Sequence, residues 1–229
     1  MGAGAAIRAE EAPEGSQMST FPAFLMLAGT CAAAAIDVGT DELPMNKPFC
    51  GDCYQDLRYQ VLLLDSDLGT AATIGSISFK RSPIGGEGFV EFDLFRIYVA
   101  RCNADQLSEQ FDQNWIDGTR VLVYDHSDVT ITAGGTDEWF EVPFDTQYFY
   151  PGVDNLLIEF EWAGGAHSIY NWGWNAGIAR SVTGGYGDEW GSAETEVPHF
   201  LIDGTLDLAP STFGALKASA DDWRAGEQQ

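Results

Sequence analysis

Apolar and polar residues alternate along much of the chain after residue 58. The clearest runs are FVEFDLFRIYV at 89–99, WFEVPF at 139–144 and NLLIEFEW at 155–162, all rich in β-branched and aromatic residues. Asp, Gly and Pro fill the intervals between the runs, as they do between the strands of an all-β domain. The pattern therefore predicts a protein built almost entirely of β-strands.

The same pattern predicts individual strands and one helix. Strands are expected at 59–64, 73–80, 88–100, 120–125, 129–132, 138–144 and 155–162, with less regular ones near 167–174, 177–182 and 199–208. One short helix is predicted at 104–111, because Asn103 suits an N-cap and Leu107 and Phe111 share a helical face. So many strands predict two packed antiparallel sheets, that is, a β-sandwich with jelly-roll-like connections.

The N-terminal residues have the features of an export signal. An uncharged, mostly apolar run, FPAFLMLAGTCAAAA at 21–35, ends with Ala33 and Ala35 in a small-x-small cleavage motif. Residues 1–35 are therefore assigned to a signal-peptide region, and the mature chain is expected to begin at Ile36. Arg8 is the only basic residue before the run, so Met18 is an alternative start that would make residues 1–17 a misannotated extension.

The remaining residues divide into three parts. Residues 36–48 are predicted to be a tether or an added edge strand, 49–208 the sandwich domain and 209–229 a flexible acidic tail. No apolar run after the signal region reaches the roughly 20 residues that a membrane-spanning helix needs. We expect a secreted, extracellular or cell-surface protein whose mature chain does not insert into a membrane.

The charge of the chain is strongly one-sided. Its 229 residues carry a formal net charge of −24 at pH 7. The electrostatic field of so acidic a chain repels phosphate groups, which argues against nucleic acid and anionic membrane surfaces as partners. Acidic pairs such as Asp65 with Asp67 and Asp125 with Asp128 offer oxygen atoms of the kind that a structural Ca²⁺ ion binds, although none has the EF-hand spacing. We expect no other cofactor, and the calcium ligands stay unassigned.

The order of four segments resembles a known kind of module. The segments are PFCGDCYQDLRYQVLLLDSDLG, TIGSISFK, FRIYVARCNADQLSEQFDQNW and TDEWFEVPFDTQYFYPGVDNLLIEFEW. Together they resemble β-sandwich modules of secreted bacterial cell-surface proteins, which often adjoin sorting or anchoring tails. The resemblance covers residues 48–207. It implies an extracellular, non-catalytic module and transfers no catalytic residue.

Cys50 and Cys53 form the sharpest local motif, CGDC. A redox-active pair is expected at the start of a helix, and a zinc site needs two further ligands, whereas this motif precedes a strand in an all-β chain. For an exported protein we favour a structural disulfide that holds the N-terminal segment to the sandwich. Cys102 ends a predicted strand and is a suitable partner for Cys50 or Cys53, and the sequence does not decide which one it would pair with.

A segment rich in Gly and Asn holds the candidate ligand-binding residues, which are Tyr170, Trp172, Trp174, Tyr186 and Trp190. Aromatic rings on polar loops can form a platform on which sugar rings stack, with a few polar groups to fix the hydroxyls. Alternatively, the rings cover an open end of the core, because Trp and Tyr are large enough to do so.

These observations leave a binding protein as the first functional hypothesis and a structural protein as the second. The first is a non-catalytic module that binds a polysaccharide or another component of an extracellular surface through the aromatic cluster. The second is a self-assembling cell-surface or filament protein, a homo-oligomer in which residues 36–49 add a strand to a neighbouring copy. No Gly-x-Ser-x-Gly elbow or phosphate-binding glycine loop is present, so we do not expect an enzyme.

Overall fold

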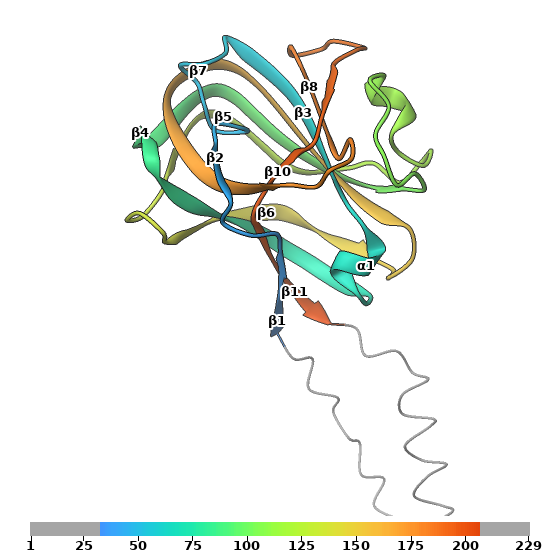
Figure 1. The fold of residues 1–229 in the computed structure, drawn as a ribbon. Coiled ribbons are helices and arrows are strands. Elements are labelled where there is room, and N and C mark those ends of the chain that lie inside the picture. Colours follow the sequence, from blue (N-terminus) through green and yellow to red (C-terminus); the bar gives the residue numbers. More distant parts are fainter. Residues whose placement is uncertain (1–32, 207–229) are drawn as a thin grey trace, which may run out of the picture. The chain divides into compact units, whose positions relative to one another are not determined.

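The computed structural model describes residues 33–206, where the chain is almost entirely antiparallel β-sheet (Figure 1). The strands are β1 (Ala33–Val38), β2 (Leu43–Met45), β3 (Asp56–Leu63), β4 (Ala72–Cys102), β5 (Val121–Thr132), β6 (Trp139–Tyr150), β7 (Asn155–Asn175), β8 (Ser181–Gly184), β9 (Ser192–Glu194), β10 (Glu196–Pro198) and β11 (Phe200–Leu206). The helical elements are α1 (Asp65–Leu68) and a short 3₁₀ turn, η1 (Phe111–Gln113). The prediction of an all-β antiparallel protein is confirmed.

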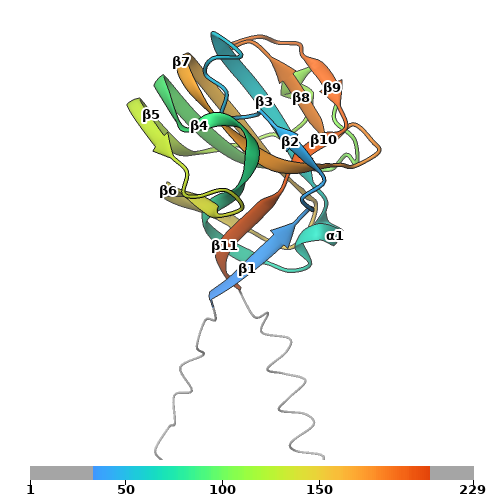
Figure 2. The same cartoon turned by 60° about the vertical axis from the view of Figure 1, so that its left-hand side comes forward.

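The strands form one continuous sheet that curls into a half-barrel (Figures 1 and 2). Its main path runs β1-β11-β4-β7-β3-β8-β9, while β5 and β6 also pair with β4, and β2 and β10 with β7. The long strand β4 connects the two parts of the sheet. Its first residues pair with β6 and β11, and its later residues pair with β5 and β7.

Three pairs of predicted strands are single strands in the structure. The predicted runs at 73–80 and 88–100 both lie in β4, those at 120–125 and 129–132 in β5, and those at 155–162 and 167–174 in β7. In β4 the pairing register shifts on both sides of Gly86, which has a φ of 72°. Glycine adopts this conformation at little cost, so the chain bends there without leaving the sheet.

The predicted helix at 104–111 is wrong. Leu107 and Phe111 are both buried, as the helical pattern required, but their backbone amides bond to other segments. The amide of Leu107 donates to the carbonyl of Ala179 at 2.8 Å, and that of Phe111 donates to the carbonyl of Glu189 at 3.1 Å. These tertiary hydrogen bonds replace the bonds within a helix and hold the segment against the connections that precede and follow β8 (Ser181–Gly184).

One large apolar core packs against β3, β4, β6, β7 and β11. Phe79 lies at its centre, with its ring centroid 4.6 Å from that of Phe49 and 5.1 Å from that of Phe200. The alternating pattern predicts six core residues in the strands at 88–100, 120–125 and 155–162, and four of them are buried, namely Ile97, Val123, Leu156 and Ile158. Two others are not, since Leu94 is only partly buried and Val121 is 37% exposed at the start of the edge strand β5.

The segment predicted as a tether or edge strand, 36–48, contributes strands at two places. β1 pairs with β11 and β2 pairs with β7, so this part of the chain is already paired within its own molecule. The expected cleavage after Ala35 falls inside β1. Residues 1–32 of the predicted signal region and the predicted tail at 209–229 lie outside the described residues. No helix within 33–206 is long and apolar enough to cross a membrane.

Candidate functional site

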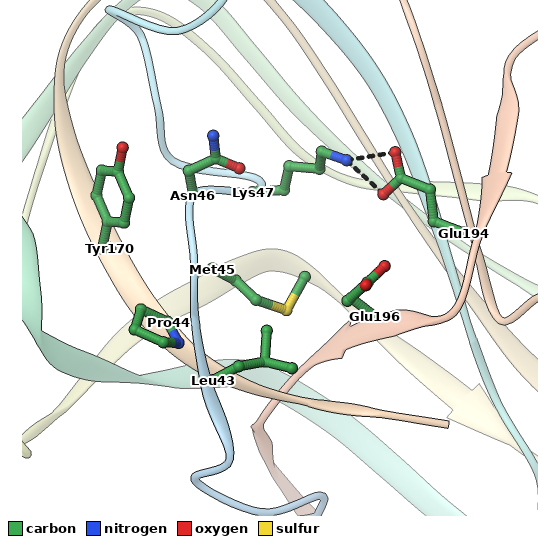
Figure 3. Close-up of a pocket in the computed structure, with 8 residues that line it drawn as sticks. All are labelled: Leu43, Pro44, Met45, Asn46, Lys47, Tyr170, Glu194 and Glu196. Atoms are coloured by element: carbon green, nitrogen blue, oxygen red, sulfur yellow. Dashed lines mark hydrogen bonds and ion pairs between the residues drawn. The ribbon is translucent and has the colours of Figure 1, made fainter. Parts of the chain in front are cut away.

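An open groove of about 370 Å³ lies where β2 meets β7, β9 and β10 (Figure 3). It is lined by Leu43, Pro44, Met45, Asn46, Lys47, Tyr170, Glu194 and Glu196. In Figure 3 the segment 43–47 runs between Tyr170 on one side and Glu194 and Glu196 on the other. The groove therefore has an aromatic end and an acidic end, with apolar and polar side chains between them.

The end of β7 positions the groove because it carries β2 on one edge and β10 on the other. Leu43 of β2 and Pro198 of β10 both pair with Gly173. A Cβ atom on Gly173 would lie 2.1 Å from Sδ of Met45 and 2.7 Å from the carbonyl oxygen of Val197. The absence of a side chain at Gly173 lets Met45 pack across β7, where it is 6% exposed and forms part of the groove lining.

The groove contains one lysine and two carboxylates. Nζ of Lys47 lies 2.6 Å from Oε1 of Glu194 and also contacts the second carboxylate oxygen, and the lysine side chain is 11% exposed. Within residues 33–206, Glu196 has no ion-pair partner. Burial raises the pKa of the neighbouring Tyr59 phenol, and the charges of Glu194 and Glu196 raise it further. The acidic end of the groove therefore carries an uncompensated negative charge.

Tyr170, at the aromatic end, is held from two directions. The backbone of Gly85 packs against its ring, since a Cβ atom on Gly85 would lie 2.8 Å from ring carbons. Gly85 has a φ of 84°, which also favours glycine. On the other side the hydroxyl of Tyr170 lies 3.9 Å from Sγ of Cys53, and Nδ2 of Asn46 donates to the same sulfur at 3.4 Å.

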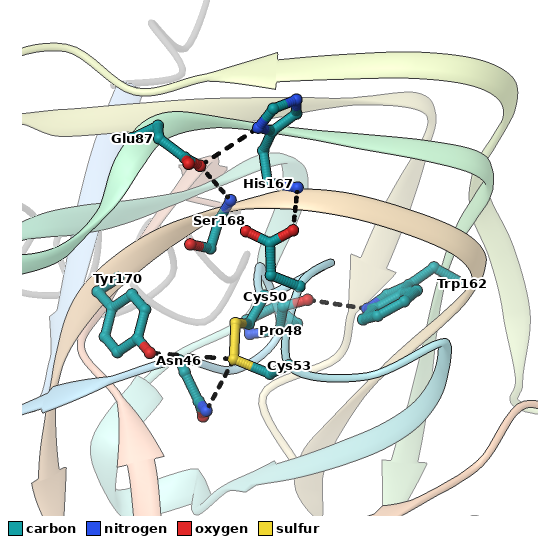
Figure 4. Close-up of a disulfide and its surroundings, with 10 residues drawn as sticks. Asn46, Pro48, Cys50, Cys53, Glu87, Trp162, His167, Ser168 and Tyr170 are labelled. Atoms are coloured by element: carbon teal, nitrogen blue, oxygen red, sulfur yellow. Dashed lines mark hydrogen bonds and ion pairs between the residues drawn. A yellow bond between two sulfur atoms is a disulfide. The ribbon is translucent and has the colours of Figure 1, made fainter.

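The structure joins Cys50 to Cys53 beside this aromatic end, with 5.2 Å between their Cα atoms (Figure 4). The predicted pairing of Cys102 with one of them is wrong. Cys102 is free and buried in a second, smaller apolar cluster with Leu107 and other residues.

The disulfide between Cys50 and Cys53 closes a tight turn, and other contacts attach this turn to β7. The amide of Ile169, for example, donates to the carbonyl of Phe49 at 2.8 Å.

The other predicted aromatic residues have different neighbours. The indole N–H of Trp172 donates to the Asp137 carboxylate at 2.7 Å, and Trp174 packs partly buried against the large core. Tyr186 and Trp190 lie between β8 and β9 and are 38% and 59% exposed. Of the five predicted residues, Tyr170 alone is among the groove-lining residues.

A second polar cluster lies on the face of β7 that points away from the large apolar core. Glu159 and Glu161 alternate along this strand with core residues, so their side chains project away from the core. Nε of Arg58 lies 2.8 Å from Glu159 and 3.5 Å from Glu161, and a terminal nitrogen of Arg120 lies 3.1 Å and 3.5 Å from the same two carboxylates. The two carboxylates thus share two arginines.

The pKa values of the two carboxylates shift in opposite directions. Burial, and then the charge of Glu159, raise the pKa of Glu161 to about 7. Burial acts in the same direction on Glu159, but the charges of Arg120 and Arg58 outweigh it and lower its pKa. Gln60 donates to Glu159 at 2.8 Å and to the carbonyl of Phe111 at 3.2 Å. The cluster therefore fastens the connection between β4 and β5 to the sheet.

Sequence reasoning missed Asn46, Lys47, Glu194 and Glu196. Lys47 and Glu194 are 147 residues apart, and only the pairing of β2, β7 and β10 brings these ends of the chain together. The rarity of lysine in so acidic a chain was a weak signal. Among the described residues, no three His, Cys, Asp or Glu side chains converge as metal ligands, so the calcium site stays a prediction without ligands.

Comparisons with protein-family models, with curated proteins and with solved structures returned no significant match for this chain.

Proposed function

We propose that this protein is a secreted, non-catalytic module that binds a polysaccharide of an extracellular surface in the groove beside Tyr170. The observation that carries the proposal is the combination, in one open groove of about 370 Å³, of an aromatic ring with amide and carboxylate groups. Sugar-binding sites need both, because the apolar face of the sugar stacks on a ring while polar groups accept bonds from its hydroxyls.

The immediate surroundings of Tyr170 also support a rigid site. Gly85 packs against the ring, and the disulfide turn touches its hydroxyl, so the ring is fixed before a ligand arrives. A fixed ring loses little side-chain entropy on binding, which favours affinity.

For the whole domain we propose a jelly-roll-like β-sandwich in which β4 passes from one layer to the other, because the larger apolar core lies against strands from both parts of the sheet.

The proposal predicts that Tyr170→Ala weakens binding of a retained polysaccharide about tenfold, because the stacking surface is lost. The ligand would be found on a glycan array and the affinities measured by calorimetry. Tyr170→Phe keeps the ring and should bind like the wild type. Trp190→Ala removes an exposed ring outside the groove and should also have no effect.

Thermal melting of each variant separates lost binding from lost folding. A wild-type protein that retains no polysaccharide would contradict the proposal, and so would a folded Tyr170→Ala variant with undiminished affinity.

A further inference from the structure

We infer that the groove selects polysaccharides that carry protonated amines, that is, chains of amino-sugar units such as glucosamine. The inference rests on the proposed function and names the class of ligand for the same groove. It follows from the groove's charge, from the hydrogen-bonding groups that face it and from the position of its aromatic ring.

The groove has a negative charge that no side chain of the described residues neutralises. Lys47 is engaged by both oxygens of Glu194, and this pair is largely withdrawn from solvent, with the two side chains 11% and 27% exposed. Glu196 lines the same groove without a cation beside it in the described part of the chain. The groove therefore keeps one negative charge in excess, and a cationic ligand would neutralise it.

The groove also has hydrogen-bond acceptors that its own side chains leave open to a ligand. Asn46 uses its Nδ2 group to donate to Cys53, which leaves its amide oxygen as an acceptor. The carboxylate of Glu196 only accepts, and Lys47 already directs two of its three donors to the oxygens of Glu194. The groove thus presents acceptors to a ligand, and an ammonium group, with three donors and a positive charge, complements them best.

The separation of the aromatic end from the acidic end favours a ligand longer than one small cation. Tyr170 and Glu196 lie on opposite sides of the segment 43–47 (Figure 3). A single small cation cannot occupy both ends, whereas a chain with a sugar ring on Tyr170 can extend across the segment 43–47 toward Glu196. Uronate or sulfate groups would meet the excess negative charge of the groove and of the whole chain, which has a net charge of −24.

The test compares oligosaccharides of equal length that differ in charge, measured by calorimetry with the full chain. We expect a glucosamine oligomer to bind at least about tenfold more tightly than its N-acetylated form, because acetylation removes the charge that meets Glu196. Glu196→Gln should abolish this difference by weakening the binding of the charged oligomer, and the N-acetylated form, which brings no charge to this position, should lose less affinity than the charged one. Glu189→Gln, an exposed carboxylate outside the groove, is the matched control.

The outcomes separate the inference from the function on which it rests. Equal affinity for the charged and N-acetylated oligomers, or tighter binding of a galacturonate oligomer, would overturn the inference while polysaccharide binding stands. Binding of oligolysine that depends on Glu196, without binding of any glucosamine oligomer, would overturn it in favour of a basic peptide. A wild-type protein that binds none of the saccharides would overturn both.

Discussion

Glu161 shows how strongly a single buried side chain can couple this protein to pH. Its side chain is 11% exposed and shares Arg58 and Arg120 with Glu159. Burial and the charge of Glu159 raise its pKa from 4.5 to about 7. Between these two values the folded protein holds a proton that the unfolded chain has released. The contribution of Glu161 to stability is therefore greatest below pH 4.5 and is lost as the pH rises toward 7.

The substitution Glu161→Gln should remove this contribution to pH dependence. We expect the free energy of unfolding of the variant, relative to the wild type, to rise between about pH 5 and about pH 8, because the glutamine cannot be deprotonated. Urea unfolding across this range measures the difference. Glu91→Gln, at an exposed position of β4, controls for the general loss of negative charge. Parallel pH profiles of wild type and Glu161→Gln would contradict the prediction.

At the scale of elements, buried side chains add to the backbone hydrogen bonds that hold the connection between β4 and β5. Asn114 is 2% exposed and bridges this connection to the sheet. Its Nδ2 group donates to Gln60 at 2.8 Å and to the carbonyl of Ser108 at 2.9 Å, and its oxygen accepts from the amide of Ser108 at 2.8 Å. Because Gln60 in turn binds Glu159, loss of Asn114 would also leave buried polar groups without partners.

We expect Asn114→Ala to lower the free energy of unfolding by about 2–3 kcal/mol, since several buried hydrogen bonds are lost together. Gln113→Ala changes the preceding residue, which is exposed, and should lower the free energy of unfolding by less than about 0.5 kcal/mol. Denaturant unfolding gives both values, and amide exchange should increase most at 104–116. Equal small effects of the two substitutions would show that the connection is held in another way.

At the scale of the whole molecule, strand pairing and the large core hold the fold together, while the disulfide acts locally. Cys50 and Cys53 are three residues apart, so their bond closes a very small loop of the unfolded chain. By contrast, β1 pairs with β11, and β2 with β7, so the first and last described strands are joined without a covalent bond. The protein should therefore stay folded when the disulfide is reduced.

Reduction is expected to lower the free energy of unfolding by only about 2 kcal/mol, because the entropy that a disulfide removes grows with the length of its loop. Urea unfolding with and without a phosphine reductant measures this cost. The double variant with Cys50→Ala and Cys53→Ala should no longer respond to the reductant. Complete unfolding on reduction would contradict the local role of the bond.

The alternation of apolar and polar residues determined the fold class and the positions of most strands. This prediction is possible because successive side chains along a strand face opposite sides of the sheet. A strand with one buried face therefore has alternating apolar and polar residues in its sequence. Residues such as Ile97 and Ile158 were therefore recognisable as core from local pattern alone. The concentration of aromatic residues near 170–190 likewise drew attention to Tyr170, which lines the groove.

Tertiary structure decided the rest, because it depends on which distant segments pair. The segment at 104–111 had a helical pattern, but hydrogen bonds to Ala179 and Glu189 gave it another conformation. Glycines in β4 bent the strand where the sequence suggested two. The groove itself needed β2, β7 and β10 to meet, which placed Lys47 beside Glu194 and left Glu196 without a cation in the described part of the chain. No local sequence pattern predicts how these strands pair, because the pairing is stabilised by contacts between residues far apart in the sequence.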